Sequence, residues 1–156
     1  MKGNDEVIEI LNDVLTAELT GINQYFIHAM MCANWRYQRL AEHSRKESTE
    51  EMKHARQLIE RILYLEGMPN LQRLGSVRLG EDPVEQLRLD LELEREAVAR
   101  FNQGITLAVQ HGDNGTRHLL EEMLTAEEDA VDWLETQLGL VESLGEQLYL
   151  SEQLHT

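Results

Sequence analysis

The sequence of 156 residues contains few of the residues that interrupt helices or cross-link chains: two prolines, ten glycines and one cysteine. The prolines and glycines cluster, so long stretches contain no helix breaker. A single thiol, Cys32, cannot form an internal disulfide, which favours a reducing compartment such as the cytoplasm. No apolar run reaches transmembrane length, and segment 1–11 does not resemble a signal peptide, so no membrane association is expected.

Positive charge is also scarce, because 14 basic residues stand against 29 acidic ones and the formal net charge is −15. Such a surface repels phosphate backbones, so nucleic acid is not expected as a partner. It attracts cations, which suits metal handling without proving it. With 42% hydrophobic and 28% charged residues, the chain is typical of a single globular domain over residues 1–156.

Apolar residues recur at alternating steps of three and four, which predicts four long amphipathic helices and no strands. We expect them at about 4–35, from the 35–39 region to 65, from 83 to a turn at 112–115, and at 116–143. Asp82 and Pro83 form a favourable helix start, and the Gly-Asp-Asn-Gly cluster is a strong helix end. Gly145 separates a short terminal helix at 146–154. The predicted fold class is all-α, a four-helix bundle with a short fifth C-terminal helix.

The connection at 66–82 is long for a loop inside one domain. A connection of this length favours a crossover between parallel second and third helices. Its spaced apolar residues suggest packing either along the bundle or against another subunit, and thus favour an oligomer; these are Leu71, Leu74, Val77 and Leu79.

Each predicted helix carries a glutamate at a core position of its apolar stripe: Glu18, Glu51, Glu94 and Glu127. Buried carboxylates are unfavourable and repel one another, so a cation is expected between them. His54 follows Glu51 at a spacing that puts both on one helix face. Carboxylates with an imidazole favour iron or manganese over calcium or magnesium.

The same residues have simpler interpretations when each is taken alone. A glutamate in an apolar stripe is more often a helix-edge residue that reaches solvent, and Glu-x-x-His occurs by chance in an acidic chain. The conjunction of one glutamate on each of four helices with a correctly spaced histidine favours a di-iron site of the ferritin-like kind. That pattern has a second Glu-x-x-His, and here Ala130 stands where its histidine is expected.

With these residues in view, the chain resembles bacterioferritin over essentially its whole length. The resemblance is carried by the segments at 1–3, 23–26, 51–55, 60–63, 65–72 and 132–135, of which those around His54 and Asn70 are the most specific. It implies a ferritin-like bundle in a hollow cage of twenty-four subunits that stores iron as a ferric mineral. It also implies ferroxidase activity with dioxygen or peroxide, haem b between paired subunits, and a ferredoxin as reductant.

The resemblance also implies roles for individual residues. Glu51 and Glu127 would bridge two irons, Glu18 and His54 would complete the first iron, and Glu94 would be the terminal ligand of the second. Ala130 leaves that second iron without its imidazole, which predicts weaker occupancy and slower oxidation.

Met52 matches the methionine that would bind haem b. Its pattern alone indicates a core gap filler, whereas the resemblance makes it the haem ligand. Because it directly follows Glu51, it is expected to face away from the core site, where a neighbouring subunit could lie.

Three functions remain open at this point. The first is an iron-storage and ferroxidase subunit with haem-assisted iron release, in a cage of one or two subunit types. The second is a haem-carrying electron-transfer subunit of a mixed cage, with little ferroxidase activity of its own. The third is a rubrerythrin-like peroxidase, against which the lack of a rubredoxin-type cysteine cluster argues.

The sequence also suggests roles for several further residues. Tyr25 and His28 are candidates for hydrogen bonding a metal ligand, each with a structural alternative. Lys46 and Glu50 replace a histidine and an aspartate that form an inner-surface iron site in some relatives, so that site is not expected. Four histidines are expected to be exposed, and two tryptophans to serve in packing: His43, His111, His118 and His155, and Trp35 and Trp133.

Overall fold

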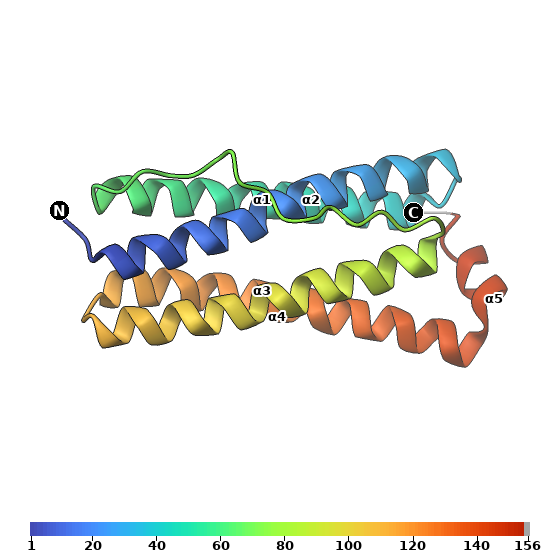
Figure 1. The fold of residues 1–156 in the computed structure, drawn as a ribbon. Coiled ribbons are helices and arrows are strands. Elements are labelled where there is room, and N and C mark those ends of the chain that lie inside the picture. Colours follow the sequence, from blue (N-terminus) through green and yellow to red (C-terminus); the bar gives the residue numbers. More distant parts are fainter. Residues whose placement is uncertain (155–156) are drawn as a thin grey trace.

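The computed structural model describes residues 1–154, so His155 lies outside the described residues. Five helices follow one another along this part of the chain, and it contains no strand: α1 (Asp5–Asn34), α2 (Gln38–Tyr64), α3 (Pro83–Gln110), α4 (Asn114–Leu144) and α5 (Glu146–Ser151). The first four form a bundle in which α1 and α4 run in one direction and α2 and α3 in the other (Figure 1). The predicted all-α bundle with a crossover between parallel α2 and α3 is therefore confirmed.

Side-chain caps explain where α1, α3 and α4 begin. Asn4 accepts hydrogen bonds from the amides of Glu6 and Val7 at the start of α1. Asp82 accepts from the Glu85 amide, with Pro83 as the first helical residue, as predicted. The start of α4 lies at Asn114, two residues before the predicted position, because Asp113 caps the helix by accepting from the Thr116 amide.

The C-terminal helix is shorter than predicted. Gly145 has a φ of 86°, in the left-handed region that favours glycine, and this residue separates α4 from α5. After Ser151 the amides of Glu152 and Gln153 bond to carbonyls three residues earlier, those of Tyr149 and Leu150. This tight turn ends α5 before residue 154.

Two apolar clusters occupy opposite ends of the bundle. The larger, which we call the proximal cluster, contains residues of the four long helices and the residue that directly follows α2: Val7, Leu11, Val14, Leu15, Ala55, Leu58, Ile62, Leu65, Ala97, Phe101, Leu120 and Met123. The smaller, the distal cluster, packs α5 against the other end: Cys32, Leu40, Ala41, Leu87, Leu91, Leu134 and Tyr149. Trp35 and Trp133 pack against the distal cluster, so their predicted packing role is confirmed.

A ladder of polar side chains on α1 holds the crossover segment. Its members recur every fourth residue: Asn12, Thr16, Thr20, Gln24 and His28. Asn12 bonds to Met68 and Asn70, and Thr16 accepts from the Arg73 side chain. Thr20, Gln24 and His28 accept from the amides of Gly75, Arg78 and Gly80 respectively. All these distances are 2.8–3.2 Å. At 1.5 Å rise per residue, the ladder covers about 24 Å of the helix.

The apolar side chains of the crossover point outward. Leu71, Leu74 and Leu79 are about half exposed, and Val77 is more than a third exposed. Packing along the bundle, one of the two alternatives drawn from the sequence, is therefore wrong for these residues. Polar bonds to α1 hold the segment instead, which leaves its apolar side chains available to another subunit. No helix among the described residues is long and apolar enough to cross a membrane.

Candidate metal centre

Four of the predicted site residues meet in the middle of the bundle. Glu18 comes from α1, Glu51 and His54 from α2, and Glu127 from α4, and all four are buried. One ligand atom of each lies within 4.8 Å of the others. His54 Nδ1 is 3.5 Å from Glu18 Oε2 and 3.3 Å from Glu127 Oε1. This spacing is typical of side chains arranged around a metal ion.

The centre contains buried polar atoms that have no hydrogen-bond partner within residues 1–154. They are both carboxylate oxygens of Glu18 and of Glu127, Oε2 of Glu94 and Nδ1 of His54. Such atoms are rare in folded proteins because each loses its hydration without compensation. Carboxylate oxygens and an imidazole nitrogen are the ligands that iron and manganese accept. The residues therefore fit a divalent metal ion.

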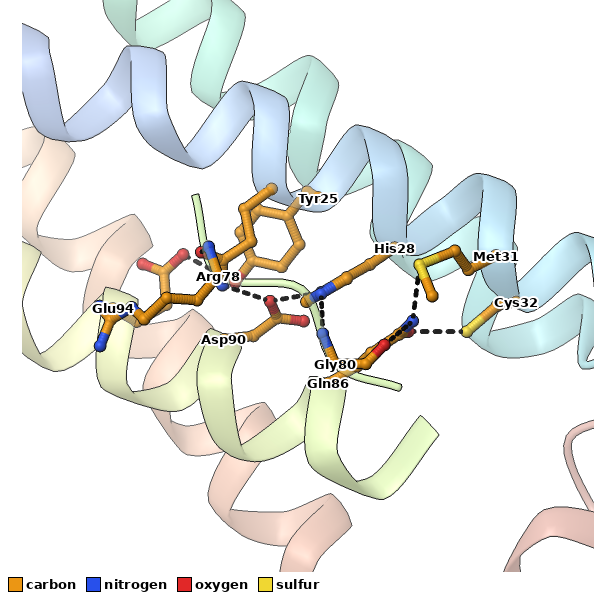
Figure 2. Close-up of polar contacts among 10 residues, drawn as sticks. Tyr25, His28, Met31, Cys32, Arg78, Gly80, Gln86, Asp90 and Glu94 are labelled. Carbon is orange, nitrogen blue, oxygen red and sulfur yellow. Dashed lines mark hydrogen bonds and ion pairs between the residues drawn. The ribbon is translucent and has the colours of Figure 1, made fainter. Parts of the chain in front are cut away.

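Glu94 of α3 adjoins this group without belonging to the set of four ligand atoms. It is fully buried, and the Tyr25 hydroxyl donates to its Oε1 at 2.7 Å (Figure 2). Burial raises its pKa well above the ordinary range, and the nearby charge of Glu127 raises it further. Glu94 thus lies beside Glu127 with one oxygen bonded and the other free, and Tyr25 hydrogen bonds a candidate ligand as expected.

The metal-free centre retains protons. Burial raises the pKa of Glu127 to about 7, and the charge of Glu18 adds to the effect. Burial alone would lower the pKa of His54, but the carboxylates of Glu127 and Glu18 outweigh it and raise the value to about 10. A metal ion must displace these protons when it binds, so metal affinity is expected to increase with pH.

Gly21 sets how closely α1 approaches the centre. A Cβ atom at this position would lie 3.2 Å from Oε2 of Glu51 and 3.3 Å from its Cδ. A glycine inside a helix is destabilising by roughly 0.5–1 kcal/mol relative to alanine. The absent side chain leaves the Glu51 carboxylate room beside α1.

Ala130 lies at a cavity of about 330 Å³ that opens beside the centre between α2 and α4. The walls include His43 and Trp133, whose rings stack at a centroid distance of 3.4 Å and an angle of 11°. The expectation that His43 is exposed is therefore wrong: burial, with nearby Lys46, lowers its pKa to about 4. His111 and His118 are exposed as expected.

A buried polar network lies next to Glu94, toward the distal cluster (Figure 2). His28 Nδ1 lies 2.9 Å from Asp90 Oδ1, and His28 Nε2 accepts from the Gly80 amide at 3.0 Å. Because Nε2 accepts, Nδ1 carries the proton and donates it to Asp90. Gln24 also donates to Asp90 Oδ1, at 2.9 Å. His28 is thus a structural histidine with both nitrogens satisfied, and it bonds no candidate metal ligand.

Met52 lies on the outside of α2. Its side chain is 58% exposed, whereas the adjacent Glu51 is 4% exposed. The expected orientation, away from the metal centre, is confirmed. Its side chain is therefore accessible from outside the subunit.

Sequence reasoning missed two features around the centre. Glu47 lies one turn before Glu51, half-buried at the wall of the cavity. Asp90 lies one turn before Glu94 and is buried. The four-residue spacing from a predicted ligand was the available signal for both.

Comparison with known proteins places the chain in a family. A family model described as the ferritin-like domain matches residues 8–144. Bacterioferritin BfrA of Mycobacterium tuberculosis (strain ATCC 25618 / H37Rv) is 45% identical over 152 residues, covering 97% of this chain and 96% of the relative. A bacterioferritin of Streptomyces coelicolor is 48% identical over 151 residues, covering 97% and 90%. A bacterioferritin of Brucella melitensis is 44% identical over 149 residues, covering 96% and 92%. The chain belongs to the bacterioferritin family of ferritin-like proteins.

Proposed function

We infer that the chain is an iron-storage subunit of a homo-oligomeric bacterioferritin cage that oxidises Fe(II) at the buried carboxylate–histidine centre. Family membership supports iron storage. The observation that carries the catalytic part is the set of six buried polar atoms without partners, contributed by all four long helices. A bound cation would offset the repulsion of these buried carboxylates in place of the protons that the metal-free centre retains.

The chain's own residues would divide the work of binding. Glu51 and Glu127 would lie between two irons, with Glu18 and His54 at the first and Glu94 at the second. Two Fe(II) ions bound there would supply two electrons to dioxygen or peroxide. His54 would release its Nδ1 proton on binding, and the Tyr25 hydroxyl would hold Glu94 in place.

Ala130 distinguishes the two metal positions. The first has the His54 imidazole, whereas α4 offers no nitrogen ligand to the second. We therefore expect the second iron to bind more weakly and paired oxidation to be slower. The adjoining cavity, with Asp129 in its wall, offers a route for Fe(II) from solvent to the centre.

The site around Met52 supports a haem role. Met52 provides a single axial ligand from each chain, so a haem held by two Met52 side chains requires a second copy of the chain. Haem b bound in this way would pass electrons to the ferric mineral and assist iron release, with a ferredoxin as reductant. The single cysteine agrees with a cytoplasmic location.

A second candidate function is a haem-carrying electron-transfer subunit of a mixed cage with little ferroxidase activity of its own. The combination of an exposed Met52 with Ala130 favours it. In that case partner subunits with an intact centre would oxidise Fe(II).

Aerobic oxidation by the metal-free cage at two Fe(II) per subunit tests the proposal, with Glu51→Gln as the inactive control. We expect a fast first phase of ferric absorbance that Glu51→Gln abolishes. Equal rates in the two proteins would contradict a ferroxidase centre. A much faster first phase in Ala130→His would favour the electron-transfer subunit, and equal rates for that variant would favour a competent ferroxidase.

Haem absorbance in the protein as isolated tests the second site. We expect a low-spin spectrum that Met52→Leu abolishes. A protein that binds no added haem b would contradict the role of Met52.

A further inference from the structure

The cavity beside the centre brings Glu47 of α2 to the same level as Ala130 of α4. Because α2 and α4 run antiparallel, a step back along α2 and a step forward along α4 lead in the same direction (Figure 1). Glu47 precedes Glu51 by four residues, about one turn, and Ala130 follows Glu127 by three. Both Glu47 and Ala130 line the cavity.

The Glu47 side chain is poorly paired for a carboxylate with so little exposure. It is 18% exposed, and its ion-pair partner within residues 1–154 is His43, whose Nε2 lies 3.9 Å away. That distance is too long for a hydrogen bond. Burial, with nearby Lys46, lowers the pKa of His43 to about 4, so the imidazole is neutral near pH 7 and does not balance the charge of Glu47.

Glu47 also shares the cavity wall with Glu127, a candidate ligand of the second metal position. Independently, Oε2 of Glu94 and both oxygens of Glu127 are buried without partners. The second metal position thus has unpaired carboxylate oxygens on α3 and α4 and a carboxylate of α2 in the adjoining cavity wall.

We propose that Glu47 supplies the ligand that Ala130 does not, so that a carboxylate of α2 completes the second metal position. This inference rests on the proposed function. The smaller side chain at position 130 leaves the cavity open, and Glu47 lines it on the same helix face as Glu51.

Exchanging an imidazole for a carboxylate changes the metal preference of the centre. A carboxylate is a harder ligand, which suits iron and manganese more than zinc or copper. It also adds one negative charge beside the two ions. The expected result is a higher relative affinity for Mn(II) over Zn(II) than in the Ala130→His variant.

Anaerobic titration with Co(II), followed by visible absorbance and calorimetry, tests the proposal on the metal-free cage. The variant is Glu47→Gln, which keeps the shape and removes the charge. The matched control is Glu50→Gln, because Glu50 lines the same cavity but bonds to Lys53 at 3.1 Å on the exposed side. We expect the intact chain to bind two Co(II) per subunit, and Glu47→Gln to weaken the second by at least about tenfold. Glu50→Gln should bind as the intact chain does.

A double variant and the remaining outcomes make the test decisive. Adding Ala130→His to Glu47→Gln should restore the second Co(II), which a merely structural role of Glu47 would not allow. Equal second-site affinity in Glu47→Gln and the intact chain would overturn the proposal, and so would an intact chain that binds a single Co(II). Both results leave the proposed metal centre standing. Only an intact chain that binds no Co(II), or one unaffected by Glu51→Gln, would overturn the centre itself.

Discussion

The proximal cluster and the metal centre are consecutive parts of the same helices with opposite chemistry. Around Leu58 and Phe101 the inward side chains are apolar and fully buried. A turn or two along the helices, Glu18 and Glu127 occupy equivalent inward positions and leave buried oxygens without partners. The apolar region stabilises the metal-free fold, whereas the polar region destabilises it until a cation binds. One amphipathic pattern thus provides both stability and a site.

The largest expected effect on stability comes from a substitution in the proximal cluster. Phe101→Ala should lower the free energy of unfolding by about 3–5 kcal/mol, because the side chain is fully buried in the proximal cluster. Denaturant unfolding of the metal-free protein measures it. The Co(II) stoichiometry of the folded variant should remain unchanged.

Val109→Ala is the matched control, since Val109 lies near the end of α3 and is 55% exposed. Its effect should stay within about 0.5 kcal/mol. A loss of Co(II) binding in folded Phe101→Ala would contradict the separation of the two regions.

The stability of the metal-free protein should depend on pH, because the metal centre contains groups whose pKa values are raised in the folded chain. The folded chain holds a proton on Glu127 from its ordinary pKa of 4.5 up to about 7, and one on His54 from 6.5 up to about 10. The unfolded chain has already released both protons in these windows, so stability falls as pH rises through each. Between pH 5 and pH 6.5, where Glu127 sets the slope, we expect the metal-free protein to lose about 2 kcal/mol, measured by urea unfolding.

The acidic surface also grows more repulsive as pH rises, so a control must separate the two effects. Glu127→Gln removes the buried titration and keeps the surface, and its stability should fall less steeply over the same range. Identical slopes in both proteins would assign the pH dependence to the surface. Saturating Co(II) should reverse the slope in the intact chain, since the metal displaces the protons.

The smallest expected effect comes from the hydroxyl next to the centre. Tyr25→Phe removes the donor to Glu94 Oε1 and should weaken Co(II) binding about tenfold, or about 1.4 kcal/mol. Tyr149→Phe is the control, because its hydroxyl also donates to a side-chain oxygen at 2.7 Å, that of Gln137, but in the distal region. Equal Co(II) affinities in the two variants would contradict a positioning role for Tyr25.

Local patterns predicted most of the fold because they describe local physics. The Asp82–Pro83 start and the Gly112–Gly115 turn are properties of a few adjacent residues, and helix amphipathicity is a property of one helix. The buried glutamates were predicted for the same reason, since each breaks an apolar stripe. These signals required no knowledge of which helices meet.

Features that depend on contacts between helices escaped prediction. The stacking of His43 on Trp133 joins α2 to α4, and nothing in either helix alone distinguishes His43 from an exposed histidine. Similarly, the role proposed for Glu47 depends on Ala130, which lines the same cavity from α4. The outward orientation of the crossover leucines depends on the polar ladder of a distant helix.

That ladder determines how the crossover segment can vary. Gly75, Arg78 and Gly80 are recognised through their backbone amides, which every residue except proline possesses. Side chains between the ladder contacts can therefore be exchanged without releasing the segment from α1. Gly80 is an exception, because a Cβ there would lie 2.5 Å from the Gln86 backbone nitrogen. The crossover is thus a peptide held mainly by its main chain, whose outer face is open to redesign.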